Sequence, residues 1–240
     1  MAFPQTHRSV VLAVRSGDPE ERARALEAVI AAYWRPVQRH LVTRWRESDD
    51  DSRDLTQGFF AAALEKGWLA RFDPVRGRFR TYLLACLDGF VAKERRSARR
   101  LKRGGEAAFV PLETRGEDGE PRELPLADGT DLEVEFQREW ARSLFALAVE
   151  ELRVRCARTG KEVAFALLER YDIEGADSLD RPSYAELAEE RGLPVTQVTN
   201  HLHWARRELR ATVLEKLREI TASEEEFRAE ARALLGVDVP

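Results

Sequence analysis

The sequence predicts an all-α protein made of two helical domains that an acidic, flexible linker joins. Apolar residues recur at helical spacing in both halves of the chain, and no alternating strand pattern is sustained. Between the halves, residues 104–135 hold three prolines, five glycines and ten acidic residues against two arginines, a net charge of −8. Such a segment buries too little apolar surface to fold as a domain.

Length and composition set outer limits on the function. The chain has 240 residues, 34% of them charged, and a formal net charge of −4. This balance excludes a uniformly basic nucleic-acid coat but allows local basic faces. Two cysteines, Cys86 and Cys156, are too few for a disulfide scaffold, and we expect buried thiols in a reducing compartment. No apolar run reaches a membrane span of about 18 residues and no secretory signal is apparent, so we expect a cytoplasmic protein.

The first predicted domain covers residues 18–105. It opens with Asp18-Pro19-Glu20-Glu21, a typical N-cap, first-turn proline and acidic first turn of a helix. Pro36 is expected to kink this helix or to start a new one. A polar turn at 47–52 then precedes another helix, which ends at Gly67.

A loop and a long helix complete this domain. Residues 68–80 contain Asp-Pro and Arg-Gly pairs, which favour a loop. The long helix is expected to run from about Phe79 to Arg103, where two glycines stop it. The acidic linker then occupies residues 106–133.

The second predicted domain covers residues 134–222 and begins with two helices, over 136–152 and 164–171. A C-terminal extension, 223–240, begins with a second capping-box pattern at Ser223 and carries an apolar stripe. We expect this extension to pack on a domain surface, with binding of a regulator as the alternative.

A helix-turn-helix is the strongest local signal in the second domain. Ser183 and Glu186 form a capping box that opens a short helix. Gly192 ends this helix in a left-handed turn, and Pro194 lies where a second helix can begin.

The second helix of this motif can enter a major groove of DNA. Its outward side chains are polar or basic and suit base edges and phosphates: Thr196, Gln197, Thr199, Asn200, His201, His203, Arg206, Arg207 and Arg210. The alternative is an ordinary helical hairpin with a polar outer face.

A basic helix is the second signal. Residues 93–103 carry one acid and seven cations: Lys93, Arg95, Arg96, Arg99, Arg100, Lys102 and Arg103. Counterion release makes such a face a phosphate binder, whereas a solvated helix end would account for only two or three cations.

Aromatic and arginine side chains alternate just upstream of that basic helix. The residues of this stretch that we assign to DNA are Phe72, Arg76, Arg78, Phe79 and Arg80. Exposed aromatics among arginines form a platform on which unstacked bases can lie. The alternative is that the aromatic rings belong to the core.

The order of these motifs resembles the extracytoplasmic-function group of bacterial RNA polymerase sigma factors. The resemblance covers about residues 25–218. It rests on Asp54-Leu55-Thr56-Gln57-Gly58-Phe59-Phe60, on Gly77-Arg78-Phe79-Arg80-Thr81-Tyr82-Leu83-Leu84, and on the basic helix, acidic linker and helix-turn-helix that follow.

This resemblance implies a promoter-specificity subunit with two DNA-binding domains. Asp54, Leu55 and Gln57 would dock on the polymerase clamp, and residues 72–80 would capture a flipped base of the −10 element. The basic helix would contact the adjoining duplex, and the second domain would read the −35 element. The linker would thread the RNA path of the polymerase, or serve as an inert spacer.

The implied partners are core RNA polymerase and promoter DNA in the bacterial nucleoid, and the resemblance leaves room for an anti-sigma factor. The chain departs from the family pattern at Asp88-Gly89, where a polar or basic pair is common, and near Thr199 and His201, where Lys or Arg is usual. The first departure implies altered promoter melting, and the second implies either weaker phosphate anchoring or a different −35 preference.

Enzymatic interpretations find little support in the sequence. The acidic run at 49–51 has no nearby histidine and is typical of a solvated cap, and we find neither a phosphate-binding glycine loop nor a nucleophile elbow. We therefore expect no catalytic residue, metal or cofactor. Two other functions stay open: a stand-alone helix-turn-helix regulator of operator DNA, and a helical adaptor whose basic helix meets an acidic protein.

Overall fold

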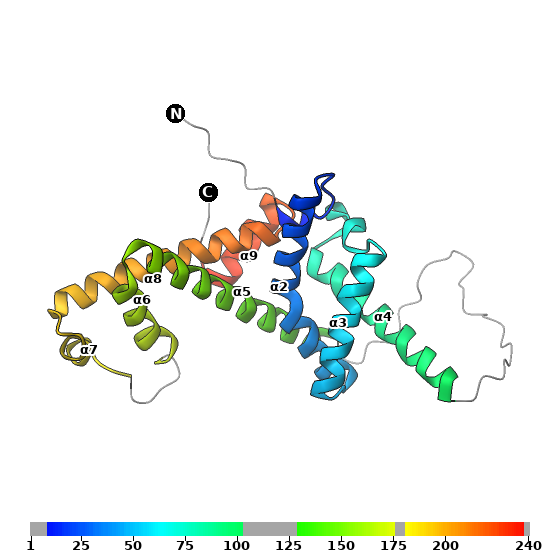
Figure 1. The fold of residues 1–240 in the computed structure, drawn as a ribbon, viewed down its shortest axis with the longest axis horizontal. Helices are drawn as coiled ribbons and strands as arrows, with labels where there is room; N and C mark the ends of the chain where they lie inside the picture. Colours follow the sequence, from blue (N-terminus) through cyan, green and yellow to red (C-terminus); the bar gives the residue numbers. More distant parts are fainter. Residues whose placement is uncertain (1–8, 103–128, 176–180, 238–240) are drawn as a thin grey trace. The chain divides into compact units, whose positions relative to one another are not determined.

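The structure, a computed structural model, describes residues 9–102, 129–175 and 181–237 (Figure 1). Every regular element within these ranges is a helix, so the predicted all-α class is confirmed. The chain forms two compact units: one is Tyr33–Trp140, and the other combines Met1–Ala32 with Ala141–Pro240. The domain boundaries expected from the sequence stay a prediction.

Helix α2 (Pro19–Trp45) begins where the sequence predicts. The Asp18 carboxylate accepts a hydrogen bond of 3.0 Å from the backbone N–H of Glu20, as an N-cap does. The helix continues through Pro36, so the expected second helix does not begin there. Pro36 and its neighbour Val37 are buried, and this packing offsets the hydrogen bond that a proline removes.

Helix α3 (Asp49–Glu65) starts inside the segment that the sequence predicts as a turn. The Ser48 hydroxyl accepts a hydrogen bond of 3.1 Å from the backbone N–H of Asp51, so Ser48 is the N-cap. The three aspartates at 49–51 form the first turn, where their charge favours the helix dipole. Gly67 follows the helix end with a φ of 63°.

Two 3-10 turns, η1 (Leu69–Arg71) and η2 (Pro74–Arg76), occupy the predicted loop. Helix α4 (Phe79–Lys102) follows and matches the predicted long helix, with residue 103 outside the described ranges. Helix α5 (Gly129–Thr159) begins within the last residues of the predicted linker, 106–133. The rest of that linker, 106–128, also lies outside the described ranges.

The core of the unit Tyr33–Trp140 is rich in aromatic side chains. Its buried rings come from all four long helices and from the loop: Tyr33, Phe59, Phe60, Phe72, Phe79, Phe90, Phe136 and Trp140. Edge-to-face contacts join several of them, as between Phe59 and Phe90 at 5.9 Å. This aromatic core fixes α4 and the loop before it.

The other unit contains the helix-turn-helix. Helix α6 (Glu162–Leu168) passes into a π-helical turn, η3 (Glu169–Ile173), and α7 (Tyr184–Arg191) and α8 (Val195–Ile220) follow. Two apolar clusters hold these helices. One joins α5, α6 and α8 through buried residues such as Leu152, Phe165 and Ala205, and the other joins α6, α7 and α8.

The C-terminal extension packs against the protein, as predicted. Helix α9 (Glu224–Leu235) lies along α8, in the orange and red part of Figure 1, and buries Phe227 and Ala231. The short helix α1 (Val10–Ala13) also packs on α8. Residues 238–240 lie outside the described ranges.

Cys156 is buried, as expected, whereas Cys86 is only half-buried; burial raises the pKa of both thiols. No helix among the described residues combines the length and the apolar character that a membrane crossing requires.

Candidate nucleic-acid interface

The side chains of the basic stretch of α4 are described as far as Ala98. Lys93 and Arg96 are exposed, and Arg96 donates a hydrogen bond of 3.1 Å to the carbonyl of Ala92 one turn back in the same helix. The side chains of Arg99 and Arg100 are not among those that the structure describes. The two described exposed cations can therefore meet a phosphate without breaking a bond to another helix.

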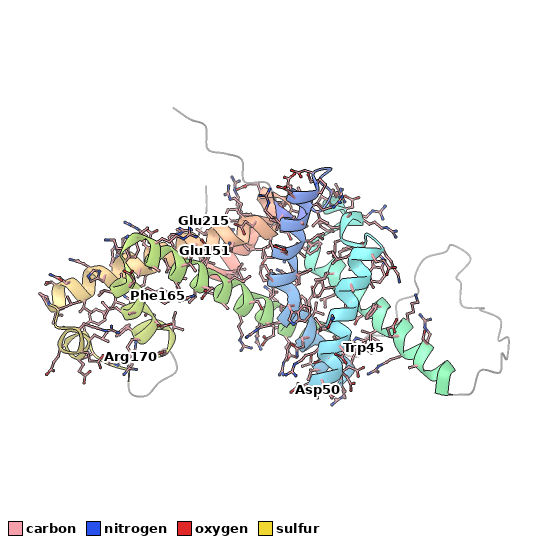
Figure 2. All side chains as sticks on the ribbon, in the orientation of Figure 1. Trp45, Asp50, Glu151, Phe165, Arg170 and Glu215 are labelled. Atoms are coloured by element: carbon pink, nitrogen blue, oxygen red, sulfur yellow. The ribbon has the colours of Figure 1, made fainter. Side chains whose placement is uncertain are left out.

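Arg95 differs from its neighbours because it binds the end of α2. Its Nε donates a hydrogen bond of 3.0 Å to the Glu47 carboxylate, and its Nη2 donates to the backbone carbonyl of Trp45. The guanidinium also lies 4.9 Å from the centre of the Trp45 ring. Figure 2 labels Trp45 on α2. Arg95 thus connects α4 to α2, in addition to any role in binding DNA.

The backbone of Arg46, just after the end of α2, has an unfavourable conformation. Arg46 is an exposed, non-glycine residue with a φ of 54°, in the left-handed region that an L-residue enters at a cost. The Glu47 N–H donates a hydrogen bond of 3.2 Å back to the carbonyl of Leu41, which closes the helix end. Arg95 then satisfies the carbonyl of Trp45.

The loop before α4 does not present the expected aromatic platform. Phe72 and Phe79 are buried and meet edge to face at 5.2 Å between ring centres. Phe79 also contacts Tyr33 of α2 at 5.4 Å. The expectation of exposed rings is therefore wrong for both phenylalanines, and the alternative that they belong to the core holds.

Arg80 is also buried, contrary to its assignment as a DNA contact on an exposed face. Its guanidinium lies 4.7 Å from the ring centre of Trp140, itself a buried residue of α5. A cation over an indole face is an attractive arrangement inside a core. Arg80 therefore joins α4 to α5.

The tip of the same loop is exposed. Val75 is 92% exposed, which is unusual for an aliphatic residue, and Arg76 and Arg78, which follow it, are also exposed. Asp73 orders the tip, because its carboxylate accepts a hydrogen bond of 3.1 Å from the Val75 N–H. Gly77, with a φ of 146°, turns the chain into α4. This tip can contact nucleic acid where the phenylalanines cannot.

The candidate docking face on α3 is solvent-exposed. Asp54 and Gln57 are exposed, as is Asp50, which Figure 2 labels near the start of the helix. Leu55, the apolar residue of this predicted docking set, is half-buried. Leu64 adds an exposed aliphatic group near the end of α3. The polar positions of this face are available to a protein partner.

Asp88 has a structural role. Its carboxylate accepts hydrogen bonds from Trp45 Nε1 at 2.8 Å and from His40 Nε2 at 3.1 Å. Burial alone would raise the pKa of Asp88, but these hydrogen bonds and the positive charges of His40 and Arg44 outweigh it, so the pKa lies below its ordinary value. Asp88 thus connects α4 to α2.

The helix-turn-helix has the predicted local structure. The Ser183 hydroxyl accepts from the Glu186 N–H at 3.2 Å, and the Glu186 carboxylate accepts from the Ser183 N–H at 2.6 Å. Gly192 ends α7 with a φ of 61°. The predicted capping box and left-handed turn are therefore confirmed: the box fixes the start of α7, and the turn at Gly192 ends α7 just before α8.

One face of α8 is exposed along four turns. Its residues follow the spacing i, i+4, i+7, i+11, i+14, and all are exposed: Thr196, Asn200, His203, Arg207 and Arg210. The opposite face is buried through residues such as Val198 and Leu202. Gln197 and Thr199 lie at the two edges of the exposed face and are also exposed, whereas His201 is half-buried. We call the five residues of this spacing the α8 polar face.

Arg206 does not belong to the α8 polar face. Its guanidinium donates hydrogen bonds to both oxygens of Asp172, at 2.7 and 3.0 Å, and to the Tyr184 hydroxyl at 3.2 Å. The hydrogen bonds to Asp172 raise the pKa of Arg206 above its ordinary value, against an opposing effect of burial. The sequence did not identify Asp172, because this contact spans 34 residues.

The described residues contain no group of three or more His, Cys, Asp or Glu side chains arranged to hold a metal ion. Comparisons of the chain with protein-family models and with curated proteins found no match.

Proposed function

We propose that this chain is a promoter-specificity subunit of bacterial RNA polymerase, a sigma factor of the extracytoplasmic-function type. The observation that carries the proposal is the order of exposed faces along one chain. An acidic and amide face on α3 comes first, then a basic face on α4, and then the α8 polar face of a helix-turn-helix. A single operator-binding domain has no need of the first two.

In this proposal α3 docks on core polymerase through Asp54 and Gln57. The loop tip of Val75, Arg76 and Arg78 contacts the −10 region, and the exposed cations of α4 neutralise phosphates of the adjoining duplex. Phe72 and Phe79 support the loop from within the core and do not stack on bases. This assignment replaces the exposed aromatic platform.

The α8 polar face reads the −35 element in the major groove. Asn200 suits a bidentate contact to adenine, and Arg207 and Arg210 suit phosphates or guanine. Each contact alone is modest. When polymerase fixes the distance between the two DNA-binding faces, the second binding event becomes intramolecular and the pair becomes specific.

The proposal places the protein in the bacterial cytoplasm on the nucleoid, with no catalytic residue of its own. The acidic segment 104–135 carries a net charge of −8 and suits a cationic channel built for RNA. An anti-sigma factor is a further partner that such a subunit can have.

Two measurements test the proposal: binding to purified core polymerase, and run-off transcription from a randomised promoter library. We expect the wild-type chain to bind core and to direct transcription, and Asp54→Arg to lose binding. Glu27→Arg, at an exposed position of α2, makes the same charge change away from α3 and should bind normally.

Operator binding without any affinity for core polymerase would identify the chain as a stand-alone regulator. Normal core binding by Asp54→Arg would refute the docking face on α3. Binding to an acidic protein with no affinity for DNA or core would instead support a helical adaptor.

A further inference from the structure

Asp172 connects three segments of the helix-turn-helix unit through one carboxylate. It lies in η3 and accepts hydrogen bonds from Arg206 of α8 and, at 2.9 Å, from Arg181, which precedes α7. The pair with Arg206 is bidentate, the geometry in which a guanidinium binds a carboxylate most specifically. The segments before α7 and within α8 are thus held to the end of α6.

Two tyrosine rings lie against this cluster. The Tyr171 ring centre lies 3.7 Å from the Arg181 guanidinium and 5.4 Å from that of Arg206. Tyr184 contacts Tyr171 edge to face at 4.9 Å. The Asp172 side chain is 24% exposed and that of Arg206 is 42% exposed, so the pair is held by its bidentate geometry more than by exclusion of water.

The π-helical turn explains how adjacent residues reach the same two arginines. The Glu174 N–H donates a hydrogen bond of 2.8 Å to the carbonyl of Glu169, five residues back. Such a turn widens the helix, and π-turns occur often at functional sites. Here Tyr171 supplies a ring and Asp172 supplies a carboxylate to the same pair of guanidinium groups.

The helical spacing separates Arg206 from the side chains that can meet DNA. Arg206 directly precedes Arg207, so its side chain lies about 100° around α8 from Arg207 and about 80° from the centre of the α8 polar face. Three of its five N–H groups already donate to Asp172 and Tyr184, which leaves two for any other acceptor.

We propose that Asp172 is a positioning residue for DNA recognition, and that its pair with Arg206 fixes how α8 presents its polar face to the major groove. Arg206 is then an internal brace and does not contact phosphate. This inference rests on the proposed function for its DNA readout, but the pairing itself is measurable without DNA.

The test uses the full chain with core polymerase and two DNA duplexes: one enriched by the wild-type protein from a randomised pool, and one unselected duplex of equal length. Asp172→Asn removes the charge and keeps the shape, and Arg206→Lys keeps the charge and loses the bidentate fork. We expect each to weaken binding to the enriched duplex roughly tenfold, with no change on the unselected duplex or in the salt dependence.

The double variant should bind no more weakly than either single variant, and Asp172→Glu should recover most of the affinity. Arg207→Ala is the matched control on the α8 polar face. It should weaken binding to both duplexes and lower the slope of log affinity against log salt by about one.

The opposite pattern would overturn the inference. If Asp172→Asn tightens binding to both duplexes and Arg206→Ala lowers the salt slope by about one, Arg206 is a phosphate contact that Asp172 masks. If the wild-type chain binds neither duplex, the proposed function fails instead. In that case urea unfolding of the single and double variants decides: additive losses refute the brace, and non-additive losses support it.

Discussion

The indole Nε1 of Trp45 donates a hydrogen bond of 2.8 Å to the carboxylate of Asp88, and so joins the last residue of α2 to the middle of α4. His40 donates to the same carboxylate oxygen from one turn earlier in α2. The long helix that carries the exposed cations is therefore fixed by a polar contact as well as by its apolar face. Asp88 therefore helps to hold α4 against α2.

Asp88→Asn should lower the free energy of unfolding by about 1–2 kcal/mol at pH 7, because hydrogen bonds to a charged acceptor are stronger than those to an amide. The lower end of this range is expected, since the side chain is 35% exposed. Urea unfolding measures the loss. Glu94→Gln, an exposed acid of the same helix, should change stability by less than about 0.5 kcal/mol.

The stabilisation by Asp88 should also depend on pH in a defined direction. Its pKa is lower in the folded protein than in the unfolded chain, where a carboxyl group titrates near 3.9. The stabilisation is therefore complete above about pH 4 to 5 and is lost as the pH falls through the folded pKa. The difference between wild type and Asp88→Asn should shrink toward zero in acid. A difference that grows as the pH falls would contradict the assignment.

Backbone conformation predicts opposite effects at two positions in the left-handed region. Gly192→Ala should destabilise the protein by about 1 kcal/mol, although no atom lies within 4 Å of the added Cβ, because the cost is conformational. Arg46→Gly should stabilise it by about 0.5–1 kcal/mol, once the greater chain entropy of glycine is subtracted. Thermal or urea unfolding of both variants checks the pair, and equal signs would contradict the argument.

The exposed cations of α4 should set part of the salt dependence of promoter binding. Lys93→Ala together with Arg96→Ala should lower the slope of log affinity against log salt by about two, because each phosphate contact contributes about 0.9. The polymerase holoenzyme on a promoter fragment is the material for this titration. Arg22→Ala with Arg24→Ala, two exposed cations of α2, is the control with the same charge change. Equal slopes for wild type and the α4 variant would exclude a phosphate role for this face.

The exposed tip before α4 should affect promoter opening and leave folding intact. Val75→Asp places a carboxylate where we expect a base or a sugar, and should reduce open-complex formation roughly tenfold or more by charge repulsion. Its free energy of unfolding should stay within about 0.5 kcal/mol, because the residue is 92% exposed. Permanganate reactivity of promoter thymines measures the opening. Val163→Asp, at an exposed position of α6, is the control, and opening equal to wild type in Val75→Asp would exclude the tip from the interface.

Local sequence patterns predicted the helices well and the side-chain environment poorly. The capping box at Ser183, the left-handed Gly192 and the start of α4 are set by neighbouring residues, so they can be read from a short window. Helical periodicity also separates the α8 polar face from its buried side. The burial of Phe72 has no such signal, because a residue in a loop follows no period that would show which way it points.

The sequence did not predict which charged residues bind partners that are distant along the chain. Arg95 and Arg206 were both assigned to DNA, yet Arg95 binds Glu47, 48 residues away, and Arg206 binds Asp172 across 34 residues. Nothing in the local sequence distinguishes such an arginine from its exposed neighbours. The π-helical turn that brings Asp172 to α8 is equally absent from any local pattern, so the brace could only be found in three dimensions.

The burial of α9 against α8 has a practical consequence for dissecting the protein. The C-terminal half of α8 buries Val213, Leu217 and Ile220, and Phe227 of α9 is buried in the same unit. A chain cut at residue 222 would lose this cover and expose an apolar strip prone to self-association. An affinity tag or fluorescent fusion should therefore be placed after α9, and an isolated DNA-reading fragment should keep α9.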